Sequence, residues 1–141
     1  MEKRSLRKLT GLLLWLLATS ALGESVAVAV IGHPQLPKVD VQLVRKLYTG
    51  RALEVGSTPA VVLNAPPGTP LRERFMALYL NEDDEKYIAY WTVRRFIGKG
   101  TPPQELESPL AIIDFVQKTP GAIGYIDAAD VKPGMNVLIR R

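Results

Sequence analysis

The sequence Gly121-Ala122-Ile123-Gly124-Tyr125-Ile126 carries no charge and combines small residues with β-branched and aromatic ones. This composition predicts a buried strand over 122–126, which begins after the turn Thr119-Pro120-Gly121. Before that turn, Ser108 followed by Pro109 predicts a helix start, because serine caps free amides and proline in the first helical position loses no hydrogen bond. A helix over 108–119 therefore leads into this strand.

The same alternation of helices and strands extends along the rest of the chain. In order, the predicted elements are a strand over 25–31, a helix over 41–48, a strand over 60–63, helices over 70–79, 85–97 and 108–119, and strands over 122–126 and 137–139. Strands that alternate with helices imply crossover connections. The sequence thus predicts an α/β fold, a single three-layer domain with a mostly parallel sheet flanked by helices.

Helical spacing and capping residues give the faces and the ends of these helices. We expect Asp40, Thr69 and Ser108 to cap helices, and the acidic run at 82–85 to serve the next helix start rather than a calcium loop, whose alternating ligand spacing it lacks. The residues expected to face the core are Leu71, Phe75 and Leu78 in the second helix, Tyr87, Tyr90, Trp91 and Ile97 in the third, and Leu110, Ile113 and Val116 in the fourth.

Residues 1–23 have the order of parts found in a secretory signal peptide. A basic start is followed by an apolar run over 12–17, and Ala21 and Gly23 place small residues before the expected cleavage site. An uncleaved anchor would need about 20 apolar residues, and polar residues interrupt this run. We therefore expect an exported, periplasmic protein with residues 24–141 as its one domain, and no membrane insertion after signal removal.

Charge and rare residues exclude several classes of function. Four of the eighteen basic residues and one of the fourteen acidic residues lie in the predicted signal, which leaves a net charge of +1 and removes the support for nucleic-acid binding. Cysteine is absent, and His33 is the only histidine. Since no nucleophile with an assignable base is present, we expect no catalytic residues, no metal site, no cofactor and no enzymatic activity.

Three pieces of the sequence resemble the substrate-binding proteins of phosphate ABC transporters. The segment 43–51 is similar to the helix and glycine turn that follow their hinge strand, Gly68-Thr69 to the end of their anion loop, and Gly121-Ala122-Ile123-Gly124-Tyr125 to a strand near the end of the same lobe. The resemblance covers nearly all of residues 24–141. It implies one lobe of a class II periplasmic binding protein.

This resemblance implies that the anion site lies at the start of the second helix, where free amides and the helix dipole favour a negative oxygen. The candidate ligand-binding residues are Gly68, Thr69, Pro70, Leu71 and Arg72. Leu63 and Pro67 stand where the family has an arginine and a serine, so we expect weak binding. Arg72 and Arg74 are expected to face solvent. An ordinary capped helix start remains an equal interpretation of Gly68, Thr69 and Pro70.

Two functions are compatible with these features. The first is a weak binder of phosphate or a similar oxyanion, related to the substrate-binding component of a phosphate transporter, with a homodimer or a membrane transporter covering the open site. The second is a periplasmic interaction protein that has lost its ligand and docks on a membrane sensor or transporter.

Overall fold

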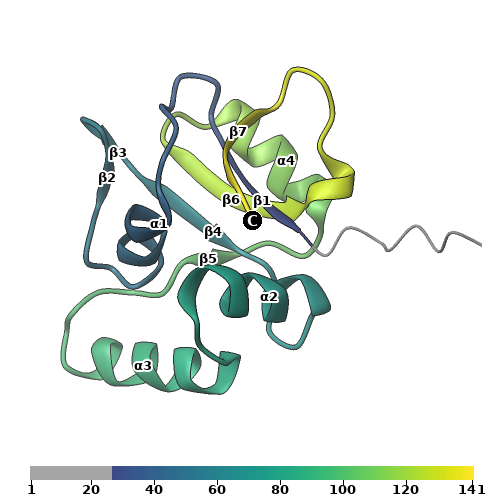
Figure 1. Cartoon of the computed structure of the whole chain (residues 1–141). Helices are drawn as coiled ribbons and strands as arrows, with labels where there is room; N and C mark the ends of the chain where they lie inside the picture. The colour runs from purple at the N-terminus through teal and green to yellow at the C-terminus, as the bar shows by residue number, and fades with distance from the viewer. Residues whose placement is uncertain (1–26) are drawn as a thin grey trace, which may run out of the picture.

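The computed structural model describes residues 27–141 (Figure 1). The predicted signal peptide at 1–23 lies outside this range. Within it, none of the helices combines the length and the apolar composition that crossing a bilayer requires.

A five-stranded sheet forms the centre of the domain, with the strand order β5-β4-β6-β1-β7. These strands are β1 (Val28–Gly32), β4 (Val61–Asn64), β5 (Gln104–Glu105), β6 (Ala122–Asp127) and β7 (Asn136–Arg140). A small separate hairpin joins β2 (Glu54–Val55) to β3 (Thr58–Pro59). The sequence predicts no strand at either position.

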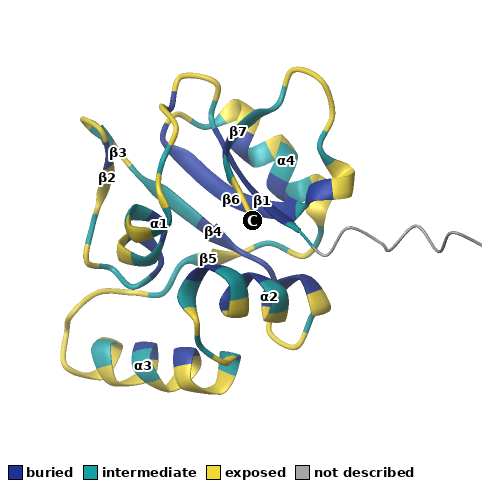
Figure 2. Ribbon diagram, viewed as in Figure 1, coloured by how far each residue is buried: buried dark blue, intermediate teal, exposed yellow. Residues whose placement is uncertain are grey.

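Helices cover both faces of the sheet, which gives the three layers that the sequence predicts (Figures 1 and 2). The helical segments are α1 (Val41–Tyr48), α2 (Pro70–Phe75) with its π-helical continuation η1 (Met76–Leu80), α3 (Asp84–Phe96), α4 (Pro109–Lys118) and the short 3-10 turn η2 (Ala128–Asp130). Side chains of α1, α2, η1 and α3 share one core cluster, whereas α4 packs into a second cluster.

The alternation of side chains along the two central strands creates these two cores. In β1, Val28 and Val30 belong to the first cluster, whereas Ala29 and Ile31 belong to the second. In β6, Tyr125 lies in the first cluster and Ile126 in the second. Every fully buried residue of the two clusters lies between 28 and 138, so residues 24–141 retain the whole described core.

The sheet is mixed, which corrects the expectation of a mostly parallel one. β4 pairs in parallel with β5 and β6, but β1 pairs antiparallel with both β6 and β7. β1 therefore runs opposite to its two neighbours, while β4, β5 and β6 run in the same direction. The α/β class and the single lobe of three layers are confirmed.

Most of the predicted helix starts are confirmed, but two residues predicted to face the core are exposed instead. Asp40 and Ser108 each accept a hydrogen bond from an amide in the first helical turn, and Asp83 does the same for α3. Leu110 and Ile97 are exposed. Helical spacing places them on apolar faces, but no other element of the described chain covers those positions.

Buried aromatic side chains fill the space between the sheet and α1, α2 and α3. The rings of Phe75 and Tyr125 stack in parallel with centroids 3.8 Å apart. The hydroxyl of Tyr48 donates to the Leu63 carbonyl at 2.7 Å, and that of Tyr79 donates to the Val28 carbonyl at 2.6 Å. Each buried hydroxyl therefore ties a helix to a strand backbone.

A glycine pair tests how tightly the start of β6 is packed. Gly121 and Gly134 both have a positive φ, of 79° and 90°. A Cβ on Gly121 would lie 2.0 Å from the carbonyl oxygen of Pro59, whereas a Cβ on Gly134 would meet nothing within 4 Å. We predict that Gly134→Ala lowers the free energy of unfolding by about 1 kcal/mol, and that Gly121→Ala lowers it by roughly 3 kcal/mol or more. Urea unfolding followed by Trp91 fluorescence measures both, and equal losses would contradict the packing.

The buried tyrosines make stability depend on alkaline pH. Burial raises the pKa of Tyr79 to about 12, and it also raises the pKa values of Tyr48, Tyr87 and Tyr125 above the ordinary value of 10.0. The unfolded chain therefore releases these protons first, so the free energy of unfolding is fully present below pH 10 and falls as the pH rises toward 12 and above. Tyrosinate absorbance at 295 nm should rise together with the loss of helical circular dichroism. Ionisation of these tyrosines near pH 10 in a folded protein would contradict this prediction.

Candidate functional site

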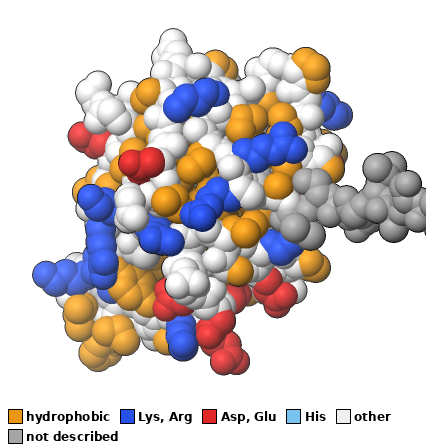
Figure 3. Space-filling model, viewed as in Figure 1, with side chains coloured by type: hydrophobic (Ala, Val, Ile, Leu, Met, Phe, Trp, Pro, Cys, Tyr) orange, Lys and Arg blue, Asp and Glu red, His pale blue; other side chains and the backbone are white. Residues whose placement is uncertain are grey.

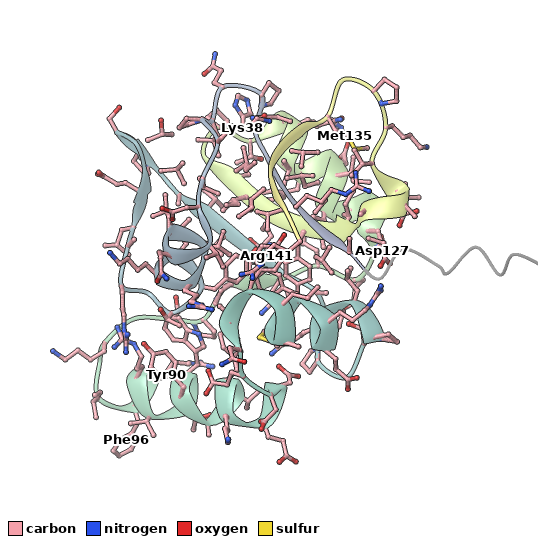
Figure 4. The ribbon with its side chains drawn as sticks, viewed as in Figure 1. Lys38, Tyr90, Phe96, Asp127, Met135 and Arg141 are labelled. Atoms are coloured by element: carbon pink, nitrogen blue, oxygen red, sulfur yellow. The ribbon has the colours of Figure 1, made fainter. Side chains whose placement is uncertain are left out.

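The helices α2 and α4 begin at the same edge of the sheet, around a cavity of about 250 Å³. The parallel strands β4 and β6 both end there, and Figure 4 shows Asp127 where β6 ends. The polar side chains that line the cavity are Thr69, Arg74, Glu107, Ser108 and Asp127. Ligands of open α/β sheets bind at this kind of edge, which makes the cavity the candidate site.

The turn that enters α2 contains a glycine whose backbone conformation favours that residue. Gly68 has a φ of 78° and is exposed, with no atom within 4 Å of the position that a Cβ would take. The Thr69 hydroxyl donates to the carbonyl of Pro66 at 2.8 Å. It makes no capping bond to the helix, so the predicted cap is wrong, and this hydroxyl closes the turn instead.

The first amides of α2 are free because they lie in the first helical turn and no side chain caps them, and Pro70 in the first position has no amide hydrogen of its own. The earliest amide of this helix with a backbone acceptor is that of Glu73, which bonds to the Thr69 carbonyl at 3.1 Å. The amides of Leu71 and Arg72 therefore point out of the start of the helix without an acceptor among the described residues. They carry the positive end of the helix dipole toward the cavity edge.

An ion pair stands beside these amides. The Arg74 guanidinium donates to the Asp127 carboxylate, and each side chain keeps about one third of its surface exposed, 32% and 31%. The pair brings one positive and one negative group to the cavity, and solvent screens both. An anion entering the cavity would gain Arg74 and be repelled by Asp127.

Arg72 lies on the other side of α2, buried rather than facing solvent, and this corrects the sequence prediction. Its side chain is 2% exposed, and it donates to Asp84 at 2.7 Å, to Glu105 at 2.9 Å and to the Ala65 carbonyl at 3.0 Å. Burial alone would lower the pKa of Arg72, but the hydrogen bonds to the two carboxylates outweigh it and raise the pKa. The guanidinium is therefore a charged structural link between α2, α3 and β5.

Three of the five predicted site residues line the cavity: Thr69, Pro70 and Leu71. Gly68 forms the adjoining turn, and the side chain of Arg72 is directed away from the cavity. Leu63 is fully buried in the core cluster under α4, so a leucine at that position cannot contact a ligand in the cavity.

Sequence reasoning missed Arg74, Ser108 and Asp127 as neighbours in one site. Asp127 follows the strand 122–126 directly, and Ser108 opens the helix before it. Because the carboxyl ends of parallel strands and the starts of the helices that follow them meet at one edge, both residues could have been placed at this edge from the predicted topology. Arg74 lies near the anion loop in the sequence and could supply charge there, but the sequence predicts that it faces solvent, and the structure leaves about one third of its side chain exposed.

A larger cavity of about 500 Å³ lies between α3 and the segment 102–105. Arg72 lines it, but the carboxylates of Asp84 and Glu105 already neutralise that guanidinium. The exposed Arg95 also lines it, and most of the remaining lining is apolar or aromatic. We take the smaller cavity as the better candidate for an anion, since Leu71, whose amide has no acceptor among the described residues, and Arg74 both line it.

No protein-family model and no curated protein sequence matches the chain significantly. Solved structures, however, share the fold of this lobe. A protein from Clostridium perfringens, described as a phosphate ABC transporter substrate-binding protein with bound phosphate, superposes with a TM-score of 0.62 at 19% identity, over 81% of this chain and 46% of its own. An ABC-type phosphate transport receptor from Vibrio cholerae gives 0.60 at 12% identity, over 81% and 47%.

The PstS protein from Borrelia burgdorferi gives a TM-score of 0.59 at 18% identity, over 79% of this chain and 46% of its own. This chain thus spans about half the length of the three solved structures. It has the fold of one lobe of phosphate ABC transporter substrate-binding proteins, as the sequence predicts. These neighbours are substrate-binding proteins and not enzymes.

The two arginines of α2 should differ sharply in their contribution to stability. Arg72→Gln removes a buried charge from between two carboxylates and should lower the free energy of unfolding by about 3 kcal/mol. Arg74→Gln breaks a pair whose side chains are each about one third exposed and should cost less than about 1 kcal/mol. Urea unfolding of both variants measures the difference. A loss for Arg72→Gln no greater than that for Arg74→Gln would show that the buried ion pairs do not hold the lobe together.

Proposed function

We propose that this protein is an exported, solute-binding-like lobe that binds phosphate or a similar oxyanion weakly in the cavity where α2 and α4 begin. The observation that supports this most is the meeting of free amides with Arg74 at one end of the sheet. Gly68 belongs to the site because its missing side chain leaves the approach to the amides open. Leu71 and Arg72 contribute backbone amides, while Thr69 and Pro70 shape the wall.

Binding is weak for two physical reasons. Asp127 places a negative charge beside Arg74, so an anion must either compete with this carboxylate or be repelled by it. The cavity also opens to solvent on the side away from the lobe, where salt and water screen the attraction. Two-lobed binders close around a ligand by a hinge motion, and the described lobe would need a second copy or another protein over its cavity to reach such a closed state.

Export accounts for the N-terminal sequence and places this lobe beside a membrane. Cleavage after Gly23 would release residues 24–141 into the periplasm. There, a homodimer or a membrane transporter would cover the open side of the cavity. The fold shared with phosphate-transporter substrate-binding proteins supports a role of the same kind.

Calorimetric titration of residues 24–141 with phosphate and with sulfate at low salt tests the site. Arg74→Gln should weaken binding about tenfold, because it removes the only side-chain cation that residues 27–141 place in the cavity lining. Asp127→Asn should strengthen binding about fivefold, because it removes the competing charge and frees Arg74. A general loss of structure would weaken binding in both variants, so opposite changes in affinity for Arg74→Gln and Asp127→Asn indicate a real site.

The control is Lys118→Gln, which removes an equal charge from the exposed end of α4, where Lys118 pairs with Asp114. Its affinity should match that of the unchanged protein. If neither anion produces saturable heat, or if Lys118→Gln weakens binding as much as Arg74→Gln, the oxyanion site is rejected and the interaction role takes its place.

A further inference from the structure

The C-terminal end of α3 exposes apolar side chains that the folding of the lobe does not explain. Val93, Phe96 and Ile97 are 59%, 91% and 57% exposed. Figure 4 shows Phe96 at a corner of the molecule, pointing away from the other elements, and Figure 3 shows hydrophobic surface gathered at the same corner. We call Val93, Phe96 and Ile97 the apolar tip.

The packing of α3 on the lobe does not need these residues. Tyr87 and Trp91 form its buried stripe, and their polar atoms both donate to the Tyr48 carbonyl, at 2.8 Å and 3.1 Å. The apolar tip lies off this stripe, in water. A single exposed apolar residue is ordinary, but three together at the end of one helix mark a contact surface.

Basic side chains surround the apolar tip, and no acidic residue lies between Tyr87 and Thr101. Arg95 and Lys99 are exposed. The Arg94 guanidinium lies 5.3 Å from the ring centre of Tyr90 and 5.6 Å from that of Trp91, and it donates to the Lys99 carbonyl at 3.3 Å. The surface therefore combines a protruding aromatic side chain with three cations. Such a surface is complementary to a partner in which an apolar layer lies beneath anionic groups.

We infer that the apolar tip docks this lobe onto an anionic lipid bilayer. Phe96 and Ile97 would enter the boundary between headgroups and acyl chains, while Arg94, Arg95 and Lys99 would contact lipid phosphates. The lobe would lie on the membrane surface and would not span it. This inference concerns a different surface from the oxyanion cavity and does not depend on it.

The geometry favours a bilayer over a second copy of the chain. A symmetric dimer through this face would set Arg95 and Lys99 against the same residues of the other copy, and like charges brought together are repelled. A bilayer needs no matching pocket for a side chain that protrudes as far as Phe96. Its anionic headgroups also meet all three cations at once, so binding should weaken strongly with added salt.

Co-sedimentation with vesicles tests the inference on residues 24–141, which retain the described core but lack the apolar run at 12–17. The anionic probe is a vesicle of phosphatidylcholine with about 30% phosphatidylglycerol, which gives the membrane a negative surface charge. These vesicles should bind the protein, and vesicles of phosphatidylcholine alone should not. Phe96→Ala should reduce partitioning about tenfold. Arg95→Gln with Lys99→Gln should reduce it about tenfold on anionic vesicles.

Leu110→Ala is the matched control, because Leu110 is 74% exposed on α4, in the other helical layer. It should bind vesicles as the unchanged protein does. Equal circular dichroism and unfolding midpoints of all variants show that the fold is retained, as expected for exposed positions. Equal binding to both kinds of vesicle, no binding to either, or an equal loss in Leu110→Ala and Phe96→Ala would overturn the inference.

Discussion

The backbone carbonyl of Tyr48 is the acceptor on which the arrangement of the helical layer depends. Both Tyr87 and Trp91 of α3 donate to it, and the Tyr48 hydroxyl donates in turn to the Leu63 carbonyl of β4. A buried donor without an acceptor costs about 1–3 kcal/mol. Because both donors of α3 are buried at this one carbonyl, α3 cannot slide along α1 without losing both hydrogen bonds, and this fixes its orientation on the lobe.

The same polar network fixes the end of β4, where the candidate site begins. The Tyr125 hydroxyl donates to the side chain of Asn64 and accepts the amide of Ala65 at 3.1 Å, while Arg72 holds the Ala65 carbonyl at 3.0 Å. The turn into α2 therefore starts from a rigid point. Since Arg72 and Arg74 are two positions apart on one helix, anchoring the first toward α3 turns the second toward the cavity.

Local sequence patterns predicted the α-helices and the longer strands, but not the two-residue strands β2, β3 and β5, nor all the partners of the side chains. The strand 122–126 and the caps Asp40 and Ser108 depend on neighbours in sequence, and the structure confirms them. The burial of Arg72 depends on Asp84 and Glu105, which lie 12 and 33 residues away. Helical spacing likewise identified Leu110 and Ile97 as apolar positions, but it cannot tell whether another element covers them.

The position of Arg72 connects the two surfaces for which functions are proposed. Its guanidinium joins the start of α3, through Asp84, to the strand end that borders the cavity, through Ala65. A lobe held on a membrane by the far end of α3 would therefore keep its cavity at a fixed angle to the bilayer, because the link is a buried set of charge-assisted hydrogen bonds and not a flexible loop. An open, weak site benefits from such placement, since an oxyanion released beside a membrane partner has only a short distance to travel.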